Sequence, residues 1–305
     1  MTTPIRPLLV AAMLAAPAAH ALSVPSPAPA AAAATSGQAA AQLQAQYTQL
    51  RASLERNAFG RPIHLVSSEA GRNQVGEVYA VVDHPFQVVE RGLRDAQSWC
   101  DVLILPYNTK HCHASGNGAG TRLAVRVGRK ADQPPEDAQP IAFRYSLQSE
   151  TADYFRVTLE APEGPLGTRD YRILLEATPL DAQHTIIHLG YSYGFGAMAR
   201  IAMQAYLATA GAHKVGFTVV GRESDGKPRY VGGMLGATER NTMRYFLAID
   251  AYLGSLAAPE GQRLDKRIND WYAASLKYPR QLSELERAEY VTMKRRESAR
   301  MKEAL

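Results

Sequence analysis

The sequence predicts an α+β fold in which a curved antiparallel sheet wraps around a long helix near the C-terminus. Several segments between residues 121 and 193 alternate apolar and polar side chains, which is typical of strands with one buried face. Few helical segments interrupt them, so neighbouring strands are expected to pair antiparallel. Residues 237–256 then carry apolar side chains at helical spacing, which indicates a long helix against that sheet.

The individual elements follow from local patterns. A helix is expected over residues 84–99, where Phe86, Val89 and Leu93 recur at helical spacing and Asp83 stands at the N-cap position. A second, almost wholly apolar helix is expected over residues 195–210. Strands rich in β-branched and aromatic residues are expected at residues 75–82, 121–128, 142–149, 154–161, 170–178 and 184–193, with two short ones at 215–220 and 228–231.

The N-terminus has the pattern of a secretory signal peptide over residues 1–21. Arg6 precedes a short apolar run, and Ala19-His20-Ala21 supplies the small residues that a signal peptidase reads. The apolar run is too short to span a bilayer. We therefore expect cleavage near Ala21 and a periplasmic or secreted mature protein.

Three further segments are expected after the signal peptide. Residues 22–41 are rich in Pro and Ala and are interpreted as a disordered linker. Residues 42–258 form one domain that begins with an amphipathic helix. Residues 259–305 form a helical C-terminal extension of two helices divided at Pro279. Packing of this pair on the domain is favoured, and a partner-binding arm or a membrane-surface helix is the alternative.

The charge is mildly positive. There are 34 Lys and Arg against 29 Asp and Glu, a net charge of +5. The two signs are interspersed along the chain, so no nucleic-acid partner is predicted. Transient contact with an anionic membrane surface is compatible with this charge.

The chain has only two cysteines, Cys100 and Cys112. In an oxidising compartment an even count favours a disulfide. Two separate thiols and a metal site are the alternatives, because His111 and His113 flank Cys112. Neighbours on an extended chain point to opposite faces, which argues against a common set of metal ligands.

Familiar catalytic motifs are absent from the sequence. It contains no nucleophile elbow, no zinc-protease helix motif, no paired-cysteine redox motif and no phosphate-binding loop. The glycine-rich residues 115–120 are interpreted as a flexible turn. His184 and His188 share one strand face, but structural roles are preferred for them. No catalytic residue, cofactor or metal ion is predicted.

Residues 76–103 (GEVYAVVDHPFQVVERGLRDAQSWCDVL) give an opening strand, an Asp-x-Pro type helix start and a Trp-containing bend. With the order of elements as far as residue 256, this run resembles the START-like (SRPBCC, helix-grip) superfamily. That superfamily includes lipid-transfer domains, birch-pollen-allergen-like proteins and polyketide cyclases. The stretches YSYGFGAMARIAMQAYLAT and GATERNTMRYFLAI further resemble exported bacterial START-domain-like proteins. The resemblance implies a hydrophobic cavity between sheet and long helix, and it implies no particular reaction.

Candidate ligand-binding residues follow from that expected cavity. Tyr offers an apolar ring and one polar tip, which suits a sterol-like or fatty-acid-like ligand. The apolar helix over residues 195–210 is either a membrane-touching lid or a buried core helix. On the last helix, arginines near its start could hold a polar head group. The candidates are Trp99, Tyr145, Tyr191, Tyr193, Met198, Met203, Arg240, Arg244 and Phe246.

The sequence therefore predicts binding or transport of a hydrophobic small molecule, a lipid, in the cell envelope. The first alternative is a cavity enzyme of the same fold, cyclase-like or hydrolase-like, acting on an apolar substrate. The second is a non-catalytic interaction protein of the envelope that docks through residues 260–305. A carrier should retain lipid, an enzyme should show perturbed titratable groups in the cavity, and a docking protein should expose an apolar stripe.

Overall fold

A computed structural model describes residues 29–197, 200–201, 204–205 and 213–302, and the side chains from residue 35 onward. The predicted signal peptide and the candidates Met198 and Met203 lie outside the described residues. The described chain contains no helix long and apolar enough to cross a membrane.

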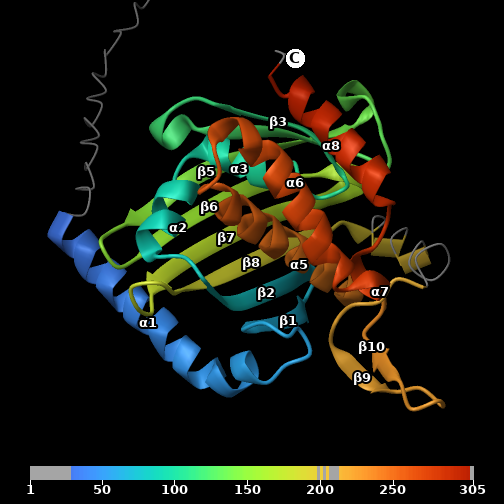
Figure 1. The fold of residues 1–305 in the computed structure, drawn as a ribbon, viewed down its shortest axis with the longest axis horizontal. Helices are drawn as coiled ribbons and strands as arrows, with labels where there is room; N and C mark the ends of the chain where they lie inside the picture. Colours follow the sequence, from blue (N-terminus) through green and yellow to red (C-terminus); the bar gives the residue numbers. More distant parts are fainter. Residues whose placement is uncertain (1–28, 198–199, 202–203, 206–212, 303–305) are drawn as a thin grey trace, which may run out of the picture.

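One eight-stranded antiparallel sheet dominates the molecule, in the order β1-β2-β8-β7-β6-β5-β4-β3 (Figure 1). Strands β3 to β8 follow one another along the chain as a meander, and β8 then pairs with β2. The predicted α+β class is confirmed. The strands are β1 (Ile63–Ala70), β2 (Asn73–Val82), β3 (Thr109–Ser115), β4 (Arg122–Val127), β5 (Gln139–Glu150), β6 (Phe155–Glu163), β7 (Thr168–Pro179) and β8 (Thr185–Phe195).

The long helix α5 (Gly233–Ser255) lies on one side of this sheet, here called the inner face, and packs against β1, β2 and β8 (Figure 1). Gly76 on β2 permits the close approach, because a Cβ there would lie 2.2 Å from the hydroxyl oxygen of Thr242 on α5. Inward side chains alternate along each strand and form the core with the buried face of α5.

Helix α1 (Pro29–Glu55) packs on the opposite, outer face against β1, β7 and β8. Gln44 donates a hydrogen bond to the hydroxyl of Thr178 at 3.4 Å. The linker predicted as far as residue 41 is helical from Pro29 onward. Alanine has the highest helix propensity, and the buried Ala40 gives this part of the helix a contact with the domain.

Two short helices replace the single helix predicted over residues 84–99. Helix α2 (Phe86–Leu93) ends where Asp95 becomes extended, and α3 (Ala96–Leu103) begins at the next residue. Trp99 donates from its indole nitrogen to the Leu93 carbonyl at 2.8 Å, and Tyr145 donates to the Arg94 carbonyl. The carbonyls of Leu93 and Arg94 lie at the end of α2 and have no intrahelical partner there, so these two side chains supply the missing hydrogen bonds.

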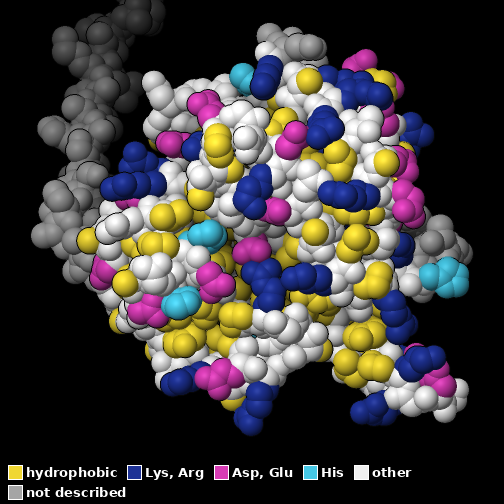
Figure 2. Space-filling model, viewed as in Figure 1, with side chains coloured by type: hydrophobic (Ala, Val, Ile, Leu, Met, Phe, Trp, Pro, Cys, Tyr) yellow, Lys and Arg dark blue, Asp and Glu magenta, His cyan; other side chains and the backbone are white. Residues whose placement is uncertain are grey.

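The C-terminal helices lie beyond α5 on the inner side of the sheet (Figure 1). Helix α6 (Glu260–Leu276) packs on α5, α7 (Pro279–Leu282) is a single turn, and α8 (Arg287–Arg300) packs on α6 and β3. Trp271 and Tyr290 are fully buried between them. A hairpin of β9 (Val219–Arg222) and β10 (Pro228–Tyr230) projects at the lower right of Figure 1. Figure 2 shows both signs of charge interspersed over this side of the molecule.

Candidate ligand-binding site between the sheet and helix α5

An aromatic cluster lines the inner face where β7 and β8 meet α5. The ring of Tyr193 lies 5.3 Å from that of Tyr191 and 5.5 Å from that of Tyr171. From the helix side, Tyr245 places its ring 5.2 Å from Tyr191. Tyr191 and Tyr193 share a face because side chains two apart on a strand point the same way. The structure therefore brings these two predicted residues together.

Helix residues that face the cluster stay partly exposed. Ala237, Asn241 and Tyr245 recur every four residues along one stripe of α5, and each has intermediate exposure. Tyr171 on β7 is also partly exposed, although it packs against the core. A side chain that touches inward aromatic rings and still meets water lies beside accessible space. Tyr245 and Tyr171 therefore lie at the border between the packed core and the surface.

The tyrosine hydroxyls in this cluster remain protonated near neutral pH. Burial raises the pKa of Tyr171 to about 12 and raises that of Tyr191 well above its usual value. Burial also raises the pKa of Tyr193, while the positive charge of Arg240 acts in the opposite direction. The Tyr171 hydroxyl already donates to the Thr168 hydroxyl at 2.9 Å, so its oxygen is left to accept a hydrogen bond from a ligand.

Polar groups stand at the edge of the aromatic cluster. Tyr193 and Thr238 have hydroxyl oxygens 3.4 Å apart. Gln74 on β2 lies directly opposite Tyr193 in the sheet register and is fully buried. Within the described part of the chain, neither the amide nitrogen nor the amide oxygen of Gln74 has a hydrogen-bond partner. A buried amide without partners is uncommon and calls for a ligand group or water that satisfies it.

The two arginines predicted for a head group have different surroundings. Arg240 is buried and donates to the Val215 carbonyl at 3.1 Å. Arg244 points instead toward the C-terminal extension, where its guanidinium lies 2.7 Å from the Glu284 carboxylate. Lys130 approaches the same carboxylate at 2.6 Å. Arg240 therefore lies near the aromatic cluster, whereas Arg244 takes part in an ion-pair network elsewhere.

The remaining sequence candidates lie in the core or its rim. Phe246 is fully buried, with the Arg61 guanidinium 5.6 Å from its ring centroid. Trp99 and Tyr145 hold the end of α2 through the hydrogen bonds given above. The structure does not bring these three residues into the aromatic cluster. Cys100 and Cys112 are bonded to each other, with Cα atoms 5.2 Å apart.

The candidates named from the sequence omit four residues of this site, which are Gln74, Tyr171, Asn241 and Tyr245. Gln74 points inward from the apolar face of β2, whereas a glutamine is expected at an exposed position. Asn241 and Tyr245 could have been found from their four-residue spacing with Ala237, because that spacing defines one stripe of a helix.

His188 forms a separate cluster on the outer face. Its two ring nitrogens lie 2.8 Å from a Glu176 oxygen and 3.2 Å from a Glu77 oxygen. Its ring stacks on Tyr79 with centroids 4.2 Å apart. Burial lowers the His188 pKa, but the hydrogen bonds to the two carboxylates outweigh it, so the pKa lies above its ordinary value. His184 lies apart, bonded to Asp181.

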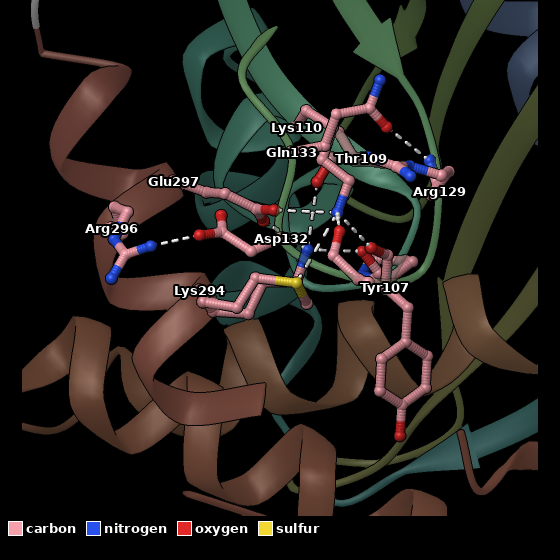
Figure 3. Close-up of polar contacts among 12 residues, drawn as sticks. Tyr107, Thr109, Lys110, Arg129, Asp132, Gln133, Lys294, Arg296 and Glu297 are labelled. Atoms are coloured by element: carbon pink, nitrogen blue, oxygen red, sulfur yellow. Dashed lines mark hydrogen bonds and ion pairs between the residues drawn. The ribbon is translucent and has the colours of Figure 1, made fainter. Parts of the chain in front are cut away.

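A buried charge cluster joins α8 to the end of the sheet (Figure 3). The Glu297 carboxylate accepts from Lys110 at 2.9 Å and from Lys294 at 2.7 Å, and all three side chains are fully buried. Lys294 also donates to the carbonyls of Pro106 and Thr109. Burial lowers the pKa of Lys294 to about 8, and the Glu297 charge opposes that change. Because these ammonium groups are saturated with partners, the cluster serves the packing of α8.

No protein-family model matches the sequence, and no curated protein matches it either. Among solved structures it is similar to norcoclaurine synthase from Thalictrum flavum in complex with dopamine and hydroxybenzaldehyde. The identity is 15%, with 49% of this chain and 89% of that chain covered and a TM-score of 0.33.

It is also similar to an aromatase/cyclase from a Streptomyces species. The identity is 13%, the match covers 68% of this chain and 95% of the other, and the TM-score is 0.31. For Ara h 8.0201 the identity is 12%, the coverage 60% and 99%, and the TM-score 0.36. All these TM-scores are below 0.5, so the fold description rests on the strand order and helix packing given above, and no activity is carried over.

Proposed function

We propose that this protein binds an apolar or amphipathic small molecule of the lipid class between the inner face of the sheet and α5. The observation that supports this most directly is Tyr245, which contacts the buried Tyr191 ring and yet remains partly exposed. An accessible space bounded by aromatic rings with few polar groups is the usual composition of a small-molecule site.

The polar edge of the site favours an amphipathic ligand. Gln74 offers a donor and an acceptor without partners, and Tyr193 offers a hydroxyl. The positive charge of Arg240 lies close enough to influence the Tyr193 pKa. A ligand with an apolar body and a carboxylate or hydroxyl end would place its body on the rings and its end near these groups.

The site of action proposed is the cell envelope. This rests on the signal-peptide pattern of residues 1–21, after whose removal the protein would carry its ligand outside the cytoplasm. In this role the protein would carry its amphipathic ligand from one apolar environment to another and would contact a membrane surface transiently.

Native mass spectrometry of residues 22–305 purified from the periplasm tests the proposal, together with solvent extraction of the same sample. A stoichiometric apolar ligand is the expected result, and its mass would identify the lipid class. A ligand-free protein that also fails to bind fatty acids, phospholipids and sterols would contradict the proposal.

A further inference from the structure

Two neighbouring pockets share two arginines, one from β4 and one from β5. The first pocket extends over β6 and β7, where the carboxylates of Glu160, Glu163 and Asp170 also line it. The pocket volumes are 680 and 690 Å³, and Arg122 and Arg144 line both. Along β5, the inward positions belong to the buried Phe143 and Tyr145, so Arg144 between them points to the outer face. Arg144 therefore points away from the inner face, although Tyr171 of the aromatic cluster also lines the first pocket and the inward Tyr145 lines the second.

Arg122 and Arg144 stand directly opposite each other in the β4–β5 register. Like charges in this position destabilise a pair of strands. Within the described residues, neither side chain makes an ion pair or a hydrogen bond. Glu160 is opposite Arg144 on the other side, but its ion pair is with Arg172, at 3.5 Å. Two like-charged side chains thus stand opposite each other at exposed positions of neighbouring strands.

The 690 Å³ pocket is suited to an anion. Three arginines line it, the third being Arg94, and no acidic residue does. Arg94 is already engaged with Glu150 at 3.0 Å, whereas Arg122 and Arg144 have no ion pair within the described residues. Thr121 and Ser146 add hydroxyls to the lining. The turn Gly118–Gly120 bounds the pocket with little side-chain bulk, so an anion can approach its backbone.

We propose that Arg122 and Arg144 form an oxyanion-binding site on the outer face, which takes the phosphate or sulfate group of a small molecule or a head group. Guanidinium forks match tetrahedral oxyanions with paired, charge-assisted hydrogen bonds. A bound dianion would also remove the repulsion between the two arginines. This assignment does not depend on the proposed function of the inner site, since neither arginine belongs to the aromatic cluster.

The test is isothermal titration of the mature chain with inorganic phosphate at constant ionic strength. Saturable binding is expected, weakened about tenfold or more in Arg122→Gln and in Arg144→Gln, because each removes one charged hydrogen-bonding fork. Arg126→Gln is the matched control, since Arg126 lies on the same strand and lines neither pocket. No saturable binding by the wild type, or equal weakening in all three variants, would overturn the proposal.

Flotation with phosphatidic acid vesicles, compared with phosphatidylcholine vesicles, identifies the source of the oxyanion. Flotation that Arg144→Gln abolishes assigns the group to a lipid head group and supports the site. Phosphate binding without flotation supports the site and assigns it to a soluble ligand. Flotation that both arginine variants leave unchanged, in the absence of phosphate binding, would overturn the proposal.

Discussion

The ring of Tyr245 on α5 lies 5.2 Å from the ring of Tyr191 on β8, so the long helix and the sheet meet through two tyrosines. Tyr191 is buried, whereas Tyr245 retains intermediate exposure. The contact therefore marks the border between the packed core and the accessible space proposed as the ligand site. How closely α5 approaches the sheet sets the size of that space.

Gly76 should be essential for the seating of α5. In Gly76→Ala the new Cβ would lie 2.2 Å from the Thr242 hydroxyl oxygen, so the Thr242 side chain or the helix that carries it must shift. We expect a loss of about 1–3 kcal/mol in the free energy of unfolding, as for other overpacked cores. Urea denaturation measures it.

Gly190→Ala is the matched control on the outer face. The nearest atom to its new Cβ is 3.6 Å away, which is ordinary contact. This variant should change stability by no more than about 0.5 kcal/mol. Equal losses in the two variants would contradict the close helix contact at Gly76.

Glu297→Gln should destabilise the protein far more than Lys294→Met. The carboxylate neutralises two fully buried lysines, and its loss leaves both without a counter-charge, at a cost of about 3–5 kcal/mol. Lys294→Met leaves the pair of Lys110 and Glu297 intact at 2.9 Å. Chemical denaturation of both variants measures the two losses in free energy of unfolding. A larger loss in Lys294→Met than in Glu297→Gln would contradict the role of Glu297 as the counter-charge of both lysines.

The contribution of His188 to stability should fall as the pH rises. Its pKa is raised in the folded state, so the contribution is complete below the unfolded pKa of about 6.5 and is lost as the pH passes through the folded value. The stability difference between the wild type and His188→Gln should therefore be largest near about pH 6 and shrink toward about pH 9. A difference constant over this range would mean that folding leaves the His188 pKa unshifted, and a difference that grows with pH would mean that folding lowers it.

Removing the disulfide should lower stability. The bond joins residues separated by 12 positions, which corresponds to about 3 kcal/mol in the chain-entropy model. The double variant Cys100→Ala/Cys112→Ala should lose stability of that order, and reductant should shift the melting temperature of the wild type only. The disulfide would make no contribution to stability if the wild-type melting temperature stayed unchanged in a reductant that reduces the bond in the unfolded protein.

The sequence predicted those elements whose side chains keep a clear period. Strands β5 to β8 alternate apolar and polar residues, and their expected positions agree with the structure within a few residues. Strand β1 was missed because Ser67 and Glu69 occupy inward positions. Ser67 donates to Glu239 on α5 and Glu69 pairs with Arg200, so tertiary partners compensate for their polarity.

The site was predictable only in part for a related reason. Tyr191 and Tyr193 follow from strand period alone. Arg244 looked like a ligand residue, but its partner Glu284 comes from the segment after α7, and no local pattern connects the two. Gln74 could not be distinguished from a surface glutamine without the register that places it opposite Tyr193. Long-range pairing, rather than local propensity, decides these positions.

The central claim is that ligand occupies the space beside Tyr245, and the affinity of Tyr245→Trp for a fluorescent fatty acid tests it most directly. The larger ring should fill that space and weaken binding about tenfold or more, while circular dichroism and melting temperature stay close to those of the wild type. Tyr230→Trp, on the projecting hairpin, is the control and should bind as the wild type does. Unchanged affinity in a folded Tyr245→Trp protein would contradict the account.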